Sequence, residues 1–413
     1  MFLCREQELS TLNKRYQKST FECIIIYGRR RVGKTSIINE FCKAKPTIFF
    51  SALNASAQEN LEALSQAIHS YSNPSAVNAP IYPNLDSALN AITELAKKER
   101  LIFVIDEYPY LAKADASISS RLQHLIDHVW EKGNLFLILC GSSMSFMENQ
   151  VLGYESPLYG RRTGQMKIQA LTYKEMTAFN PQLTPEQQAL VYGITGGIPH
   201  YINKLNVQNN IDEALLENLF NTSSYLYEEP ENLLKQELRE PAVYNSIITA
   251  IAGGASRPNE ISTKVGIESA ICAKYLKVLL ELGILTKTTP ITEKFGKKQS
   301  IVSKITSSAF GTALFHKTSL PSVQEGFLKF MSKLLRNISP LIWDWSLKKC
   351  VVTIYYATKH STPYFFLKLV NGGVQMPKLK KKYRLILSVL LLKTMNTSLV
   401  PANSKTKRLV WTN

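Results

Sequence analysis

The stretch that decides the fold is CIIIYGRRRVGKTSIINEF, residues 23–41. It opens with CIIIY, an apolar and β-branched run that is typical of a buried parallel strand. The next eight residues match the pattern G-x-x-x-x-G-K-[ST], and SIINEF follows with the spacing of an amphipathic helix. Strand, loop and helix in this order predict a phosphate-binding loop, because glycines let backbone N–H groups turn inward and the helix adds its positive end.

This loop predicts specific contacts with a nucleoside triphosphate and its metal ion. The residues expected to bind nucleotide here are Gly28, Arg29, Arg30, Arg31, Val32, Gly33, Lys34, Thr35 and Ser36. Lys34 is expected to reach the β- and γ-phosphates, and Thr35 to offer its hydroxyl to Mg²⁺.

A second segment, LIFVIDEYPYL, predicts that the triphosphate is hydrolysed. Five apolar residues, 101–105, form a strand pattern that ends in Asp106 and Glu107. An Asp at the end of such a strand is expected to hold Mg²⁺. The adjacent Glu107 is expected to polarise the attacking water as a general base, so Glu107 and Lys34 are our predicted catalytic residues.

Two later segments offer further polar groups. LFLILCG, residues 135–141, predicts a third strand, and Ser142 or Ser143 after it is placed to sense the γ-phosphate or to form an ordinary turn. In SPLYGRRT, Arg161 and Arg162 could act as catalytic arginine fingers in a neighbouring subunit of a homo-oligomer. A solvated turn is the competing interpretation of this pair.

Six motifs carry a resemblance to a known family: FLCREQELSTL, YGRRRVGKTSIINEF, FVIDEYPYL, LILCGSSMSFM, SPLYGRRT and TGGIPHYI, in that order. Together they resemble the archaeal-type ATPase family related to the AAA+ and STAND NTPases. The resemblance implies an α/β fold with a five-stranded parallel sheet flanked by helices, followed by a helical lid. It also implies ATP and Mg²⁺ as ligands, with Arg5 near the adenine and Pro199 packing near the base.

The pattern along the chain predicts four parts. We expect an ATPase core at residues 1–171, a helical lid at 172–236, a winged-helix domain at 237–300 and an irregular tail at 301–413. Three helical patterns and a hairpin-like stretch in 286–300 indicate the winged helix. Such a domain contacts either DNA or protein. The exposed set expected on its third helix, Glu268, Lys274 and Lys277, is only weakly basic.

The net charge of +17 is concentrated in the tail. Residues 301–413 hold 18 Lys and Arg but two Asp and Glu, which leaves 31 basic and 30 acidic residues in 1–300. The charge therefore says nothing about the partners of the first 300 residues. A basic tail that touches nucleic acid or a membrane surface is one interpretation.

The genetic code supports a different interpretation of the tail. In codons compatible with residues 310–314, 370–374, 383–388 and 403–411, a frame that begins one nucleotide earlier admits strings that resemble the nuclease-like C-terminal domain usual in that ATPase family. We therefore expect a frameshift near residues 300–303 and a poorly folded segment after it. We assign no catalytic or metal-binding residue beyond residue 300.

Composition bounds the location of the protein. Six cysteines without a C-x-x-C pair are typical of a reducing compartment. No secretory signal pattern is visible at the N-terminus, and the apolar run RLILSVLLLK is too short to span a bilayer. We expect a cytoplasmic protein without a membrane span.

The sequence predicts an ATP-binding and ATP-hydrolysing switch ATPase that acts through its winged helix. The first alternative is a non-hydrolysing, nucleotide-dependent regulator that binds DNA or protein. A P-loop kinase or GTPase is the second, although residues 203–206 read NKLN where a guanine motif would need Asn-Lys-x-Asp. The third is a defective, truncated member of the family.

Overall fold

The computed structural model describes residues 3–73, 80–207, 210–221, 223–238, 240–252, 255–282, 284–285, 368–370 and 373–375. The chain divides into two compact units, residues 1–350 and 351–413. In the second unit, the described residues form an antiparallel pair of short strands, β6 (Lys368–Val370) and β7 (Gly373–Gln375).

The first unit begins with a five-stranded sheet in the order β2-β3-β4-β1-β5, in which all neighbours are parallel. The strands are β1 (Glu22–Tyr27), β2 (Thr47–Ser51), β3 (Ile102–Asp106), β4 (Phe136–Gly141) and β5 (Gly164–Lys167). The predicted five-stranded parallel sheet is confirmed, and its three predicted strands begin and end within one residue of the observed ones.

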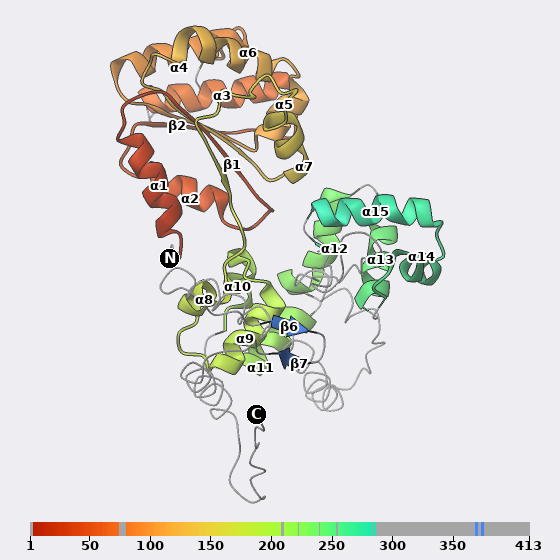
Figure 1. Cartoon of the computed structure of the whole chain (residues 1–413). Coiled ribbons are helices and arrows are strands. Elements are labelled where there is room, and N and C mark those ends of the chain that lie inside the picture. The colour runs from red at the N-terminus through yellow and green to blue at the C-terminus, as the bar shows by residue number, and fades with distance from the viewer. Residues whose placement is uncertain are drawn as a thin grey trace, which may run out of the picture. The chain divides into compact units, whose positions relative to one another are not determined.

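Helices cover both faces of this sheet, as Figure 1 shows. They are α1 (Glu6–Tyr16), α2 (Lys34–Cys42), α3 (Ala57–Ser72), α4 (Leu85–Lys98), α5 (Tyr108–Ala114), α6 (Ile118–Leu125) and α7 (Met144–Phe146), with π-helical turns at Ile126–Trp130 and Met147–Val151.

Side chains of β1 alternate between these two layers. Ile24 and Ile26 pack with Ile37 and Phe41 of α2, whereas Ile25 joins the cluster under α3, α4 and α6. Every residue of β1 is buried, and residues 23–27 therefore form a continuous apolar run rather than an alternating one.

The segment predicted to be a lid, called the lid below, follows β5 as a group of short helices with its own apolar core, which includes Leu171, Val191, Ile198 and Leu205. Its elements are α8 (Tyr173–Met176), a 3₁₀ turn (Thr177–Phe179), α9 (Pro185–Thr195), α10 (Pro199–Leu205), α11 (Ile211–Leu215), a π-helical turn (Leu216–Phe220) and α12 (Tyr225–Glu237). The Thr184 side chain caps α9, and Pro185 is the first residue of this helix.

Three further helices occupy the segment predicted to be a winged helix: α13 (Pro241–Ala252), α14 (Pro258–Val265) and α15 (Ser269–Glu281). They share an apolar cluster that includes Ile247, Ile261 and Leu279. The wing expected at 286–300 lies outside the described residues, so the winged-helix arrangement stays a prediction. The frameshifted tail expected at 301–413 lies almost wholly outside them as well.

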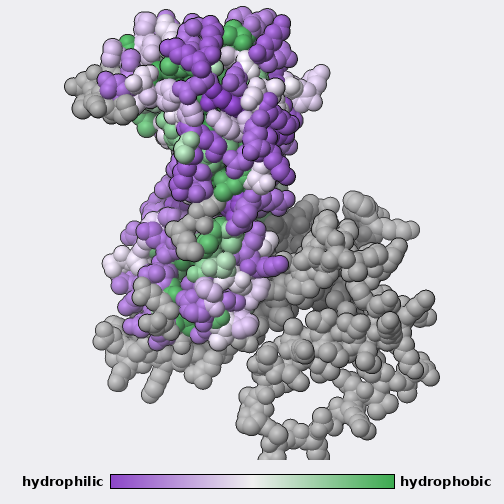
Figure 2. Space-filling model, turned by 90° about the vertical axis from the view of Figure 1, so that its left-hand side faces the viewer, coloured by the Kyte–Doolittle hydropathy of each residue, from purple (hydrophilic) through white to green (hydrophobic). Residues whose placement is uncertain are grey.

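Figure 2 shows a face that is mostly hydrophilic, with small hydrophobic areas scattered over it. Among the residues that the structure describes, no helix combines the length and the apolar character that a membrane crossing requires.

Candidate nucleotide-binding site

The phosphate loop joins β1 to α2 and depends on two glycines. Gly33 precedes α2 with φ of 95°, in the left-handed region that favours glycine. Gly28 lies against the chain that leaves β5: a Cβ atom there would stand 2.3 Å from the carbonyl oxygen of Ile168. Gly33 is therefore required by the backbone turn, and Gly28 by the close approach of two segments.

Lys34 is folded back onto its own loop. Its Nζ donates hydrogen bonds to the carbonyl oxygens of Gly28 and Arg29, both at 3.0 Å. The residue is 6% exposed, and burial lowers the pKa of its ammonium group. An ammonium group that donates to neutral carbonyls can exchange these bonds for stronger, charge-assisted bonds to an anion such as phosphate.

The two predicted metal ligands are in contact. The hydroxyl of Thr35 donates a hydrogen bond to Oδ2 of Asp106 at 2.9 Å, and the backbone N–H of Glu107 donates to Oδ1 at 3.0 Å. Asp106 is 4% exposed at the carboxyl end of β3. A hydroxyl and a carboxylate oxygen this close are ligands of the kind that Mg²⁺ takes, so the donor set fits that ion.

Glu107 immediately precedes α5 and has φ of 50°, an uncommon value for a residue with a side chain. Its Oε2 accepts hydrogen bonds from the hydroxyl of Ser142 at 2.9 Å and from the Ser142 backbone N–H at 3.4 Å. The ends of β3 and β4 thus bring the predicted base and the predicted sensor serine together.

Of these groups, Lys34, Thr35, Glu107 and Ser142 border one cavity of about 390 Å³, whereas Asp106 lies behind Thr35 and outside its wall. Its wall consists of Arg30, Arg31, Gly33, Lys34, Thr35, Ser36, Glu107, Ser142, Pro199, His200, Asn203 and Gln236. Eight of these were predicted as site residues, and Ser142 was a candidate sensor of the γ-phosphate. Sequence reasoning missed His200, Asn203 and Gln236. A signal was available for the first two, because a helix that starts at Pro199 carries positions 200 and 203 on one side.

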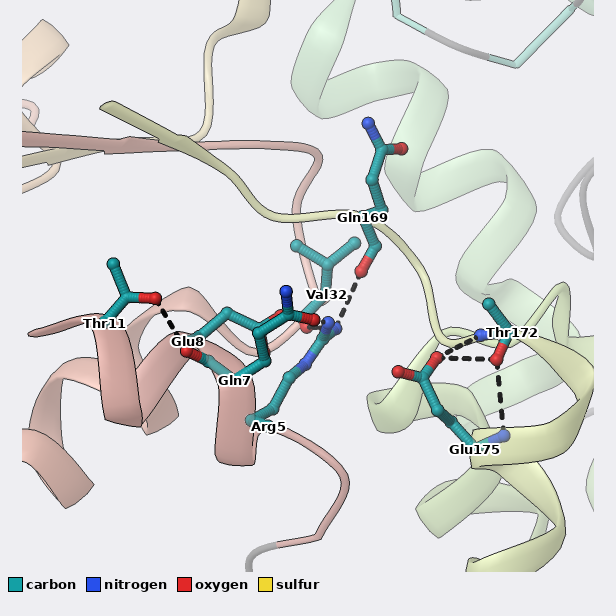
Figure 3. A network of polar contacts seen from close by, with 8 residues as sticks. All are labelled: Arg5, Gln7, Glu8, Thr11, Val32, Gln169, Thr172 and Glu175. Carbon is teal, nitrogen blue, oxygen red and sulfur yellow. Dashed lines mark hydrogen bonds and ion pairs between the residues drawn. The ribbon is translucent and has the colours of Figure 1, made fainter. Parts of the chain in front are cut away.

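Arg5 lies outside that wall, although the resemblance implies that it is near the adenine. Its guanidinium donates to the carbonyl oxygens of Val32, at 3.1 Å, and Gln169, at 2.7 Å, and it pairs with Glu8 at 2.9 Å. Figure 3 shows the side chain reaching from the start of α1 toward both carbonyls. In this structure Arg5 ties the phosphate loop to the segment between β5 and the lid.

The predicted arginine fingers also lie outside the wall. Nε and Nη2 of Arg161 donate hydrogen bonds to Oδ1 and Oδ2 of Asp127, both at 2.7 Å. The Arg162 guanidinium lies 5.6 Å from the ring centre of Tyr159. Because a finger acts on a neighbouring subunit, this placement does not test the role, which stays a prediction.

Arg30 and Arg31 link the loop to other elements. Arg30 donates to the hydroxyl of Tyr110 at 2.9 Å and to the side chain of Gln236 at 3.3 Å. Arg31 donates to the hydroxyl of Tyr201 at 3.3 Å and forms an ion pair with Glu229. Arg30 therefore contacts α12, and Arg31 contacts both α10 and α12.

Residues 2–205 match the family described as an ATPase domain predominantly from Archaea. Residues 2–205 belong to this archaeal-type P-loop ATPase family.

Two curated relatives of this archaeal-type ATPase come from Methanocaldococcus jannaschii. The uncharacterized protein MJECL04 is 32% identical over 299 residues, which are 72% of this chain and 65% of that protein. The chain thus spans about two thirds of that relative's length. The uncharacterized ATP-binding protein MJ0423 is 44% identical over 45 residues, 11% of this chain and 76% of that protein.

Solved structures show the same fold. The Walker-type ATPase PABY2304 of Pyrococcus abyssi has a TM-score of 0.57 at 18% identity and covers 75% of this chain and 96% of its own. The Aeropyrum pernix ORC2 protein, solved as ADPNP–ADP complexes, has a TM-score of 0.51 at 16% identity, with coverage of 76% and 93%. At these identities the likeness concerns the fold alone.

Proposed function

We propose that this ATPase domain binds ATP with Mg²⁺, hydrolyses it with Glu107 as the base, and uses the change in bound phosphate to shift its lid. The observation that carries the proposal is the single cavity that Lys34 and Thr35 share with Glu107 and Ser142. The crystallised ADPNP and ADP of the ORC2 structure, and the ATP-binding relative, support ATP as the ligand.

Each side chain has a chemical task in this proposal. The backbone N–H groups of the loop and the start of α2 bind the phosphates, and Lys34 leaves the carbonyls of Gly28 and Arg29 for them. Thr35 and Asp106 would hold Mg²⁺, which neutralises charge on the phosphates when bound. Glu107 takes the proton of the attacking water on a carboxylate oxygen, after Oε2 has been released by Ser142.

The lid supplies the output. Pro199, His200 and Asn203 of α10 face the same cavity as the phosphate loop, so loss of the γ-phosphate changes what these residues contact. A movement of the lid on hydrolysis is the switch that we propose, and it needs no small-molecule substrate besides ATP.

Lys34→Ala and Glu107→Gln separate binding from hydrolysis. We expect Lys34→Ala to abolish ATP binding in calorimetry. Glu107→Gln should bind ATP with Mg²⁺ as wild type does, while its turnover falls by about 10²–10⁴-fold, the range that a general base contributes. Glu131→Gln, an exposed glutamate of the core, is the matched control. Turnover by Glu107→Gln at the wild-type rate would remove Glu107 from this role.

We propose that α13–α15 bind a partner protein rather than DNA. The exposed positions of α15 carry both signs of charge, and Lys277 pairs with Glu281 at 3.8 Å. Such a helix lacks the basic stripe that attracts phosphates. Fluorescence anisotropy with labelled duplex DNA at low salt tests this choice: tight, salt-sensitive binding that Lys274→Glu weakens would favour DNA instead.

A further inference from the structure

The lid holds Arg31 of the phosphate loop in a cage of three residues. The Arg31 guanidinium forms an ion pair with Glu229 of α12. It lies 5.8 Å from the ring centre of Tyr201 and 5.5 Å from that of Tyr225, both close enough for a cation–π attraction. Tyr201 also donates its hydroxyl to Oε1 of Glu229 at 2.7 Å, so two lid helices meet at this carboxylate.

The Glu229 carboxylate depends on this arginine. Its side chain is 3% exposed, against 17% for Arg31. Oε2 of Glu229 is buried without a hydrogen-bond partner among the described residues. Burial raises the pKa of Tyr201 to about 12, so its hydroxyl keeps the proton that it donates. A buried carboxylate with half its oxygens unsatisfied becomes strongly unfavourable when its cation leaves.

Arg31 also belongs to the wall of the nucleotide cavity, together with Lys34 and Thr35. Its backbone has φ of 68°, which fixes it in a conformation uncommon for a residue with a side chain. A triphosphate in this cavity would therefore bring several negative charges to the same guanidinium that Glu229 holds. Arginine binds phosphate oxygens through the same paired N–H groups as carboxylate oxygens, so the two anions compete.

We propose that Arg31 and Glu229 form a latch between the phosphate loop and α12, which nucleotide phosphate opens by drawing Arg31 away from Glu229. The latch rests on the proposed function, because it requires nucleotide in the cavity. It adds to that function a positioning residue, Glu229, that touches no nucleotide. By linkage, the free energy that keeps the latch closed is lost from the free energy of nucleotide binding. Weakening the latch should therefore raise nucleotide affinity.

Glu229→Gln tests the latch, because glutamine keeps the size of the side chain and removes its charge. We expect ATP to bind this variant at least about fivefold more tightly than wild type, the lower end of typical coupling between sites. Hydrogen exchange gives a second measurement. ATP should speed amide exchange in α12 of the wild type, and nucleotide-free Glu229→Gln should already exchange at the faster rate.

Glu231→Gln is the matched control, since Glu231 lies on the same helix and pairs with Lys235 at 2.7 Å, with 71% of its side chain exposed. Tyr201→Phe removes only the bridging hydroxyl and should tighten ATP binding in the same direction by about twofold. It serves as the test if Glu229→Gln does not fold.

The outcomes separate the two proposals. If Glu229→Gln and Tyr201→Phe bind ATP no more tightly than Glu231→Gln, or if ATP slows exchange in α12 of the wild type, the latch is wrong and the nucleotide site stands. If wild type itself binds no ATP while Lys34→Ala behaves identically, the proposed function fails and the latch fails with it.

Discussion

The hydroxyl of Ser142 donates a hydrogen bond to Oε2 of Glu107 at 2.9 Å, across the ends of two neighbouring strands. Glu107, the proposed base, is therefore restrained by Ser142. Ser142 follows β4 at the edge of the sheet where the phosphate loop also lies. Ser142 is 7% exposed, so water does not readily replace it as a partner. This contact restrains the carboxylate that must reach the attacking water.

Removing the restraint should speed hydrolysis. Because a hydrogen bond of this kind contributes about 0.5–1.5 kcal/mol, we expect Ser142→Ala to raise the ATP turnover number by about two- to tenfold, with KM unchanged. Steady-state kinetics with Ser143→Ala as the neighbouring control measures it. A fall in turnover would instead assign Ser142 to sensing the γ-phosphate, the role that its position after the strand suggested.

Arg5 should act on stability rather than on the nucleotide. Its guanidinium bridges the carbonyls of Val32 and Gln169 and is 6% exposed. We expect Arg5→Ala to lower the free energy of unfolding by about 1.5–3 kcal/mol, the value of hydrogen bonds to a charged group, in urea denaturation.

Lys14→Ala, on the exposed face of α1, is the control for this variant. If Arg5→Ala unfolds like wild type but binds ATP more weakly, Arg5 contacts the nucleotide after all, as the family resemblance implies.

Two adjacent glycines before α10 should differ in how much stability the protein loses when each is replaced by alanine. Gly196 and Gly197 have φ of 62° and 72°, and each strains an alanine by about 1–2 kcal/mol. At Gly197 the new Cβ would also stand 2.1 Å from the carbonyl oxygen of Leu171, whereas at Gly196 nothing lies within 4 Å.

We therefore expect Gly197→Ala to destabilise the protein by about 1–3 kcal/mol more than Gly196→Ala in chemical denaturation, owing to overlap at Leu171. Equal losses of stability for the two variants would contradict the close approach of Gly197 to the carbonyl oxygen of Leu171.

His200 should make stability depend on pH. Burial lowers its pKa from the ordinary 6.5, and the nearby charges of Arg31 and Lys204 lower it further. Protons therefore bind the unfolded chain more readily than the folded one between the lowered value and 6.5. Wild type should lose stability relative to His200→Gln as the pH falls through 6.5, and the two should run parallel above it. Thermal melts from pH 5 to 8 check this, and a pH-independent difference would contradict it.

Local patterns predicted three strands of the core, and the family resemblance implied the five-stranded sheet that contains them. The run CIIIY had to be a central strand because a strand buried on both faces reads as continuously apolar, and its alternate side chains do enter two separate clusters. The glycine and lysine spacing predicted the loop, and the carboxylates after residue 105 predicted the metal side of the site. The loop and these carboxylates were expected to lie close together, because parallel strands end at one edge of a sheet.

The roles of individual side chains could not be read in the same way. Arg5 and Arg31 were both assigned to nucleotide binding, yet one bridges two backbone carbonyls and the other meets Glu229, which is 198 residues away in the chain. A charged side chain takes whatever opposite charge or acceptor the fold brings to it, and no local period encodes that partner.

The sequence by itself determined the layered α/β core and the phosphate loop with its two carboxylates, because these rest on hydrophobic period and backbone geometry within short segments. Only the tertiary structure decided how the loop connects to the lid, through the contacts of Arg30 with Gln236 and of Arg31 with Glu229. Those contacts depend on how separately folded elements pack, and that packing is set by the whole chain.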